Sequence, residues 1–379
     1  LTELRGFLLQ AGLSEHKLPD QLLPVTRWPL TAVGKIDKRQ LASLAQPEGD
    51  SCEFSHHLPL QTSPLDVIYH LLKNETDCHI AYEHNEVWDI GIGSLAQVAL
   101  YSDRAELQLP DAALQTWQGA NWKINLQRAL DALPYKKWHA YGVSHFELSH
   151  LIHEVSSPLL ATVTPLLTLF VPRLRLKLGE NSAELIATSE QELQQLIGRL
   201  KESDRVAEIT PPEAHWKARV EKCIREQDAH DYCQRVAHAI KDIQRGEYQK
   251  VILSRQITLN ESVDLLASYH YGRRFNNPSR SYVARLKGDY FVGFSPETVV
   301  EVSDSGVVST QPLAGTRALT SDEAENLRLR EVLLNDTKEI AEHAVSVKLA
   351  IEEILPLCES DSAHVSNFMN VSLRGSVQH

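Results

Sequence analysis

RSYVARLKGDYFVGFSPETVVEVSDSGVVST, from Arg280 to Thr310, is the stretch of sequence that decides the fold. Its short runs rich in valine, tyrosine and phenylalanine are typical of β-strands. Turn-forming residues separate these runs at 287–289 (KGD) and 303–306 (SDSG). Because turns this short join antiparallel neighbours, the stretch predicts consecutive hairpins.

Helical and strand-like segments flank these hairpins on both sides. Downstream, residues 321–355 predict one long helix, and Thr320 and Glu323 have the spacing of a capping box at its start. Upstream, residues 228–249 predict an amphipathic helix whose apolar residues share a face. The apolar run VILSRQITL (251–259) predicts a further strand.

The part of the chain before residue 212 mixes both kinds of element without regular alternation. Helical patches such as SPLDVIYHLL and SEQELQQLIGRL stand between strand-like runs such as EVWDIGIG, VALYS and PLLTLFVPRLRLKL. This order predicts an α+β fold rather than βαβ units. The longest apolar run (159–171) contains threonines and a proline. It is shorter than the roughly 20 residues of a membrane-spanning helix, which favours a buried strand.

Composition excludes several classes of function. The 379 residues are 42% hydrophobic and 23% charged, as in globular proteins, and the net charge of -12 argues against a nucleic-acid partner. An acidic protein can still bind an anionic substrate through local cations or a metal. Five scattered cysteines without a CxxC pair predict neither a disulfide framework nor a zinc site. A cytoplasmic protein without a membrane partner is expected.

Two residues are candidates for acid–base chemistry. Lys250 lies in GEYQKVILSR, between a predicted helix end and an apolar strand, where partial desolvation favours the neutral amine that can act as a base. Glu297 lies in GFSPETVVEV, after a strand and a proline, where a carboxylic acid facing a cavity can donate a proton. The ordinary alternatives are a surface lysine and a solvated turn residue.

Glu339 and Glu342 are candidates for binding a cation. They are three residues apart in DTKEIAEHAVSV, which places both carboxylates on one helical face. Two like charges this close favour a cation between them, and oxygen ligands suit magnesium better than zinc. The ordinary alternative is a solvated acidic stripe with Lys338 as neighbour, and Asp336 fits either interpretation.

Gly315 and Thr316 are candidates for contact with a ligand. They lie in QPLAGTRAL, between the last hairpin and the predicted long helix. A small residue lets the backbone approach a ligand closely, and the threonine hydroxyl can hydrogen-bond to it. A plain loop is the alternative.

Taken in order, five motifs resemble a known family. GEYQKVILSR, GFSPE, QPLAGTR, KEIAEHAVSVK and RGSVQH follow one another as in the chorismate-utilising enzymes, which include anthranilate, aminodeoxychorismate, isochorismate and salicylate synthases. The residues of the last three motifs are most similar to those of the salicylate synthases. WHAYGVSHFEL and PLLTLFVPR extend the resemblance to about Glu53. The resemblance implies two lobes of layered antiparallel sheets with outer helices. It also divides the chain into an N-terminal region (53–215) and a chorismate-binding region (216–379).

The resemblance gives three residues catalytic roles. Lys250 matches the base that activates water for attack on carbon 2 of chorismate. Glu297 matches the acid that protonates the hydroxyl leaving carbon 4. His379 matches the histidine of the GSVQH motif, close to the carboxylate and the pyruvyl group. A salicylate synthase then releases pyruvate in the same pocket.

The resemblance also implies a cofactor and substrate contacts. Glu342 matches a Mg²⁺ ligand, and Glu339 lies beside it in the metal region. Gly315 and Thr316 match the loop that contacts chorismate. The family continues past GSVQH with further strands and a second metal-binding glutamate. By this comparison the chain is expected to be a fragment at both ends, with poor chorismate binding and little turnover.

The first 45 residues resemble a second family. KLPDQLLPVTRWPLTAVGKIDKRQL, from Lys17 to Leu41, is similar to the C-terminal end of the aryl-acid AMP ligases, and QPEGDS (46–51) within residues 46–52 reads as a linker. Lys35 matches that family's adenylation lysine, although the large adenylation domain does not accompany it here. ATP would therefore serve only the ligase portion of a parent protein. Such a fusion implies siderophore biosynthesis, with an aryl carrier protein or a peptide synthetase as partner.

Three functional hypotheses remain open at this point. The first is the conversion of chorismate to isochorismate and then to salicylate and pyruvate. The second is an isochorismate synthase that supplies 2,3-dihydroxybenzoate. The third is a non-catalytic remnant or scaffold module derived from such an enzyme.

Overall fold

The computed structural model describes residues 53–119, 121–135, 138–157, 160, 164–205, 217–259 and 262–379. The predictions for residues 1–52, including Lys35, and the predicted boundary at residue 215 lie outside the described residues. The chain divides into two compact units: residues 1–52 with 132–138, and residues 53–131 with 139–379. Every helix and strand of the described residues belongs to the second unit.

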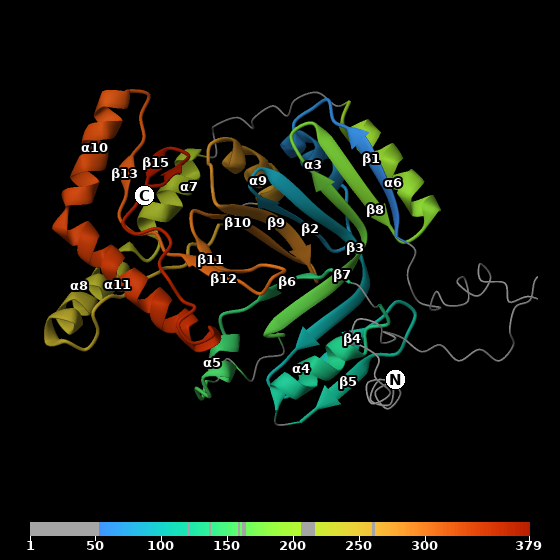
Figure 1. Cartoon of the computed structure of the whole chain (residues 1–379), viewed down its shortest axis with the longest axis horizontal. Coiled ribbons are helices and arrows are strands. Elements are labelled where there is room, and N and C mark those ends of the chain that lie inside the picture. Colours follow the sequence, from blue (N-terminus) through green and yellow to red (C-terminus); the bar gives the residue numbers. More distant parts are fainter. Residues whose placement is uncertain are drawn as a thin grey trace, which may run out of the picture. The chain divides into compact units, whose positions relative to one another are not determined.

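A ten-stranded antiparallel sheet dominates this second unit (Figure 1). Its strand order is β1-β8-β7-β3-β2-β9-β10, with β4 on β3, β5 on β4 and β6 on β7. The strands are β1 (Phe54–Pro59), β2 (His79–His84), β3 (Val87–Leu100), β4 (Arg104–Gln108), β5 (Gln115–Gln118), β6 (Tyr141–Ser144), β7 (Leu167–Leu178), β8 (Ser182–Ala187), β9 (Arg280–Leu286) and β10 (Asp289–Ser295).

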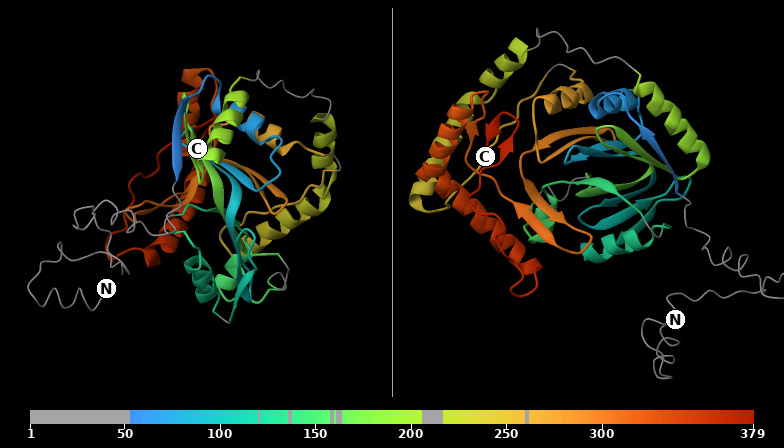
Figure 2. Two further views of the ribbon diagram at one scale, coloured as in Figure 1. Left: turned by 90° about the vertical axis from the view of Figure 1, so that its right-hand side faces the viewer. Right: turned by 45° about the horizontal axis from the view of Figure 1, so that its top comes forward.

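Three helices cover one face of the sheet and enclose the main core (Figure 2). They are α3 (Pro64–Leu72), α6 (Glu190–Ser203) and α9 (Leu265–Arg274). Serine caps begin the first two: Ser63 accepts from the Asp66 N–H and Ser189 from the Glu192 N–H. Alternate residues of the strands face these helices, because side chains along a strand alternate between the two faces. The largest side chains with less than 2% exposure here include Ile68, Tyr269, Ile90, Leu176, Leu178, Leu185, Leu196 and Leu200.

The stretch from Arg280 to Thr310 forms the predicted hairpins. β9 and β10 pair antiparallel across the Lys287–Gly288 turn, where both residues have positive φ. β11 (Thr298–Val302) and β12 (Val308–Gln311) form a separate two-stranded sheet closed by Gly306, whose φ of 82° favours glycine. The α+β class with a large antiparallel sheet is therefore confirmed.

Residues 251–259 form no strand, contrary to the prediction. The segment has no regular secondary structure, and Ile252 has 84% of its surface exposed. A strand requires a neighbour whose backbone accepts its hydrogen bonds, and in the described residues no strand pairs with this segment. The apolar run by itself was therefore evidence neither for burial nor for strand pairing.

The predicted long helix is two helices, α10 (Glu323–Asn335) and α11 (Thr337–Ile354). Asp336 breaks it with an extended ψ of 110°, and its carboxylate caps α11 by accepting from the backbone N–H groups of Lys338 and Glu339. Asp322, rather than Thr320, caps α10. Both corrections have one cause: a short carboxylate competes well for free N–H groups at a helix start.

The remaining helices are α4 (Trp122–Asp131), α5 (Leu148–Ile152), α7 (Lys217–Glu226), α8 (Ala229–Arg245) and the short η4 (Leu355–Leu357). The amphipathic helix predicted at 228–249 is α8, but its apolar face is largely uncovered. Ala239 is buried, whereas Ile240 and Ile243 are 51% and 37% exposed. None of the described helices has the length and apolar character needed to cross a membrane.

A small three-stranded sheet links two of the motifs. It has the order β13-β15-β14, with β13 at Arg317–Ala318, β14 at Leu373–Arg374 and β15 at Val377–Gln378. Arg317 pairs with Gln378, so the loop before Arg317 lies beside the last residue, His379.

The cysteine beside β2 gives a test of this packing. Burial, followed by the charge of Asp77, raises the pKa of the Cys78 thiol to about 12. Because the thiolate is the reactive form, we expect iodoacetamide to leave native Cys78 unmodified at pH 8 while exposed Cys233 is alkylated. Mass spectrometry of the peptides measures both, and equal alkylation of the two thiols in native protein would contradict the packing around β2.

Candidate active site

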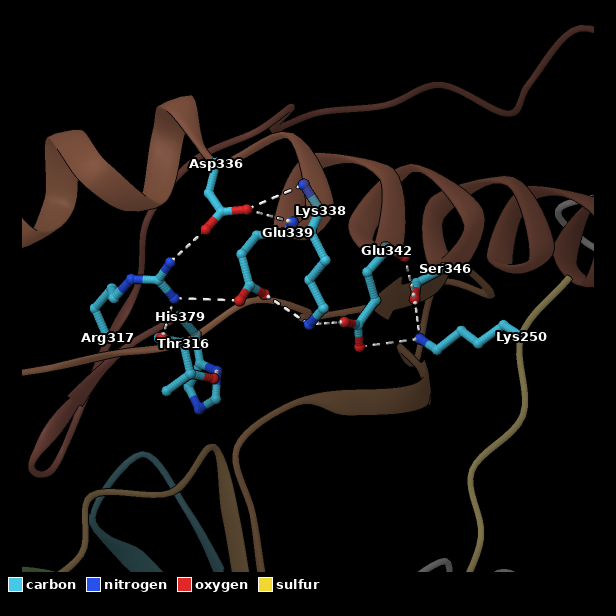
Figure 3. Close-up of polar contacts among 9 residues, drawn as sticks. All are labelled: Lys250, Thr316, Arg317, Asp336, Lys338, Glu339, Glu342, Ser346 and His379. Carbon is cyan, nitrogen blue, oxygen red and sulfur yellow. Dashed lines mark hydrogen bonds and ion pairs between the residues drawn. The ribbon is translucent and has the colours of Figure 1, made fainter. Parts of the chain in front are cut away.

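Helix α11 and the segment after α8 meet at Lys250 (Figure 3). The Lys250 Nζ donates to Ser346 Oγ at 3.1 Å and lies 3.5 Å from Glu342 Oε1. The Lys250 side chain is 28% exposed and that of Glu342 33% exposed. The predicted base and the predicted metal ligand are therefore neighbours, although they are far apart in sequence.

The ammonium of Lys338 lies between the two predicted metal ligands (Figure 3). Its Nζ is 2.7 Å from Glu342 Oε2 and 3.5 Å from Glu339 Oε2. The hydrogen bond from Lys338, together with its charge and that of Lys250, holds the pKa of Glu342 below its ordinary value. This pairing is the ordinary alternative considered for the acidic stripe, and it also shows that both carboxylates can serve one cation.

Arg317 fixes Glu339 against the start of α11. One guanidinium nitrogen is 3.2 Å from Glu339 Oε1 and the other is 2.7 Å from Asp336 Oδ2. Backbone N–H groups, Glu339's first, and the charge of Arg317 lower the pKa of Asp336. Glu339 therefore has an arginine partner that Glu342 lacks, and its side chain is 15% exposed, against 33% for Glu342.

Gly315 is a glycine for a clear physical reason. Its φ is +85°, and a Cβ there would lie 3.1 Å from Glu339 Oε2 and 3.2 Å from Leu333 Cδ1. Any larger residue would be strained in its backbone and crowded by its neighbours. The loop therefore approaches α11 more closely than a side chain would permit.

Thr316 and His379 meet at the end of the small sheet. The Thr316 Oγ1 is 3.0 Å from His379 Nδ1, a hydrogen bond whose direction depends on the histidine tautomer (Figure 3). The two motifs that carry these residues are brought together by the pairing of β13 with β15.

Glu297 contacts the same loop from its other end. Its Oε2 accepts from the Leu313 backbone N–H at 2.7 Å, and its backbone carbonyl accepts from Ser295 Oγ. Glu297 thus borders the loop that carries Gly315 and Thr316. It is not a freely solvated turn residue, because its carboxylate is bound to that loop.

His343 adds a neutral imidazole beside Lys250. Burial and the charge of Lys250 lower the pKa of His343. Its Nδ1 is buried, with no hydrogen-bond partner in the described residues. An uncharged ring here avoids repulsion with Lys250 whenever its amine is protonated.

Sequence reasoning missed two residues that organise this site. Arg317 stands within a quoted motif but was given no role of its own, whereas Lys338 was named as the neighbour of the two glutamates. Ser346 was also overlooked, because nothing in the sequence shows that it lies next to a lysine 96 positions earlier. The only signal in the sequence that could have indicated these residues is that they lie within the quoted motifs.

The oxygen atoms present are of the kind that binds a magnesium ion, but the protein side chains alone are too few to complete its coordination. In the described residues no group of three or more His, Cys, Asp or Glu side chains converges on a metal position. The two carboxylates that share the Lys338 ammonium are nevertheless of the required kind. Mg²⁺ commonly keeps several waters and takes one or two carboxylates plus substrate oxygens. Glu342 and Glu339 would hold it here.

A family model for chorismate binding enzymes matches residues 57–379, which include the whole site described above. The chain belongs to the chorismate-binding enzyme family. The match covers both the large sheet and the side chains around α11. The order of the motifs and the fold are therefore both consistent with this family.

Several members of this family are similar to the chain in sequence. A salicylate synthase of Mycolicibacterium paratuberculosis is 32% identical over 335 residues, covering 85% of this chain and 70% of that protein. An anthranilate synthase component 1 of Aeropyrum pernix is 36% identical over 144 residues. That match covers 38% of this chain and 33% of the relative, so the chain spans about a third of the relative's length.

Solved structures of family members share the fold. A menaquinone-specific isochorismate synthase of Escherichia coli superposes with a TM-score of 0.53 at 17% identity, covering 90% of this chain and 72% of that chain. Anthranilate synthase component I of Streptococcus pneumoniae gives 0.52 at 19% identity, covering 77% and 68%. At these identities the similarity concerns the fold alone.

Proposed function

We propose that this protein converts chorismate to isochorismate, and then to salicylate and pyruvate, with Mg²⁺ as cofactor. The length of the similarity to a salicylate synthase carries the proposal. That similarity extends over 335 residues, whereas the anthranilate synthase of A. pernix matches over 144. Both halves of the described unit therefore resemble a salicylate-forming relative.

The contacts of the site support the first step of this reaction. Lys250 takes a proton from water as the water oxygen bonds to carbon 2 of the ring. The double bond shifts, and the bond from carbon 4 to its hydroxyl breaks as Glu297 donates a proton, so that water leaves. Atoms balance, because one water enters and one departs. Acid–base assistance of this kind contributes typically about 10²–10⁴-fold to a rate.

The remaining residues hold the substrate in this proposal. Thr316 and His379 present hydrogen-bonding groups at 3.0 Å from each other, beside the loop that approaches α11 through Gly315. Glu342 and Glu339 would hold Mg²⁺, which when bound supplies positive charge for the carboxylates of chorismate. Pyruvate release from isochorismate in the same pocket completes the sequence of reactions.

A product assay tests the proposal directly. The gene product is incubated with chorismate and MgCl₂, with an EDTA control, and the products are separated by chromatography and identified by mass spectrometry. Salicylate with equimolar pyruvate supports the proposal. Isochorismate alone indicates the second hypothesis, a synthase that stops after the first step. Unchanged chorismate indicates a non-catalytic module. The expectation of poor chorismate binding and little turnover stays a prediction, and the rate measured in the same assay tests it.

The wider cellular role is part of the same proposal. The resemblance of residues 1–45 to an aryl-acid AMP ligase supports a place in siderophore biosynthesis in the cytoplasm, with ATP used by the ligase portion of a parent protein. An aryl carrier protein or a peptide synthetase would then be the partner. Co-purification of an aryl carrier protein or a peptide synthetase with this protein tests the proposed partnership.

Removal of the Lys338 ammonium is expected to tighten Mg²⁺ binding. Lys338 competes with a metal for Glu342 and Glu339, so Lys338→Met removes the cation that the two carboxylates share. Exposed pairs of this kind are weak, and we expect a decrease in Kd of roughly two- to fivefold. Calorimetric titration with MgCl₂ measures it. The control is Lys348→Met on the same helix, where the lysine pairs with Glu352. Equal affinity in both variants would exclude a metal site at these carboxylates.

A further inference from the structure

Ser346 stands one helical turn beyond Glu342, on the side of α11 that meets Lys250 (Figure 3). Its hydroxyl donates to the Glu342 backbone carbonyl at 3.1 Å, a common bond for serine within a helix. A hydroxyl has a single hydrogen, so Ser346 Oγ can only accept from its other neighbour. That neighbour is the Lys250 Nζ, at 3.1 Å.

We propose that Ser346 is a positioning residue for Lys250. Its hydroxyl oxygen and Glu342 Oε1 take the two N–H donors of the neutral amine, which leaves the nitrogen lone pair to accept the proton of the attacking water. The inference rests on the proposed function, in which Lys250 handles that water. In this inference Ser346, a neighbouring side chain, sets the direction in which the Lys250 amine points.

The contact is needed because little else fixes this amine. Lys250 has a flexible four-carbon stem and lies in a segment that is neither helix nor strand. The contact with Glu342 is longer, at 3.5 Å, and the same carboxylate also binds Lys338. Ser346 therefore makes the shorter of the two contacts, and it does so from a fixed point on α11.

A matched pair of variants isolates the hydroxyl. Threonine keeps the oxygen and can still donate to the carbonyl one turn earlier, whereas valine has the same shape without the oxygen. Ser346→Thr and Ser346→Val therefore differ only in the group that contacts Lys250. Any strain from the added methyl group is common to both variants.

The two variants are compared in steady-state kinetics of chorismate consumption by the gene product. We expect Ser346→Val to lower kcat roughly ten- to hundredfold, because a displacement of about 1 Å in a reacting group has effects of this size. KM should change less than twofold in both variants, and Ser346→Thr should keep kcat within about threefold of the parent. Crystal structures should show Nζ within hydrogen-bond distance of residue 346 in the threonine variant only.

The outcomes separate this inference from the proposed function. Equal kcat values for the two variants in an active enzyme overturn the inference and leave the function standing. An unmoved Nζ in the valine variant also overturns it, whatever the turnover. A parent protein that consumes no chorismate overturns the function itself. A purely structural role for Ser346 would lower the melting temperature of the valine variant without the selective loss of kcat.

Discussion

Lys250→Met is expected to lower kcat for chorismate consumption by roughly 10²–10⁴-fold while leaving the protein folded. Methionine keeps an unbranched stem of similar length but removes the nitrogen that contacts Ser346 and Glu342. Without that nitrogen the site loses the amine that is proposed to take the proton from water. KM should change little, because the proposed role of Lys250 is in bond formation and not in holding chorismate.

The control for this prediction is Lys348→Met, which removes a lysine from the other side of α11. It should retain kcat within about twofold, since an exposed ion pair contributes little even to stability. Rapid-quench measurement of a single turnover shows whether the loss lies in the chemical step. A Lys250→Met enzyme with more than a tenth of the parent kcat would remove Lys250 from the role of base.

Local sequence signals predicted the hairpin of β9 and β10 well, because its information is short-range. Alternating strand residues and a Gly288 turn with positive φ suffice to define it. The break at Asp336 was also predictable in principle. Asp336 and Glu339 have the capping-box spacing, but the prediction used only the capping box of Thr320 and Glu323.

Long-range contacts could not be predicted in the same way. The apolar run at 251–259 resembles a strand, yet strand pairing depends on where a distant neighbour lies. The contact of Lys250 with Ser346 is of the same kind. The resemblance to a family placed Lys250 and Glu342 in one site, and only the structure shows which side chains orient them.

A second long-range contact, between Glu83 and Arg273, was not predicted from the sequence. Arg273 from α9 binds Glu83 of β2 through two nitrogens, at 2.6 and 2.7 Å. The two side chains are only 11% and 3% exposed. Ser281 also donates to Glu83, and Tyr269 bridges Ser281 and Trp88. A buried carboxylate is thus satisfied by an arginine and a hydroxyl beneath the main core.

Arg273→Met is expected to destabilise the protein by about 3–5 kcal/mol, because it leaves the Glu83 carboxylate buried without a counter-charge. Urea denaturation followed by circular dichroism measures the change. Arg280→Met on the adjacent strand is the matched control. Its partner Glu301 is 44% exposed, so its loss should cost at most about 1 kcal/mol. Adding Glu83→Gln to Arg273→Met should restore part of the stability, since the neutral amide needs no counter-charge.

The same arginine connects the core to the end of the chain that carries His379. Arg273 donates to the Asn276 carbonyl at 2.7 Å, and a Cβ on Gly375 would lie 3.0 Å from the Asn277 nitrogen. The hairpin of β14 and β15 therefore packs against the loop at Asn276 and Asn277, to which Arg273 donates a hydrogen bond. We expect Arg273→Met to raise hydrogen exchange in this hairpin more than in β1. Equal exchange in both places, or a stability loss no larger than that of Arg280→Met, would show that the buried pair supports neither the core nor the hairpin.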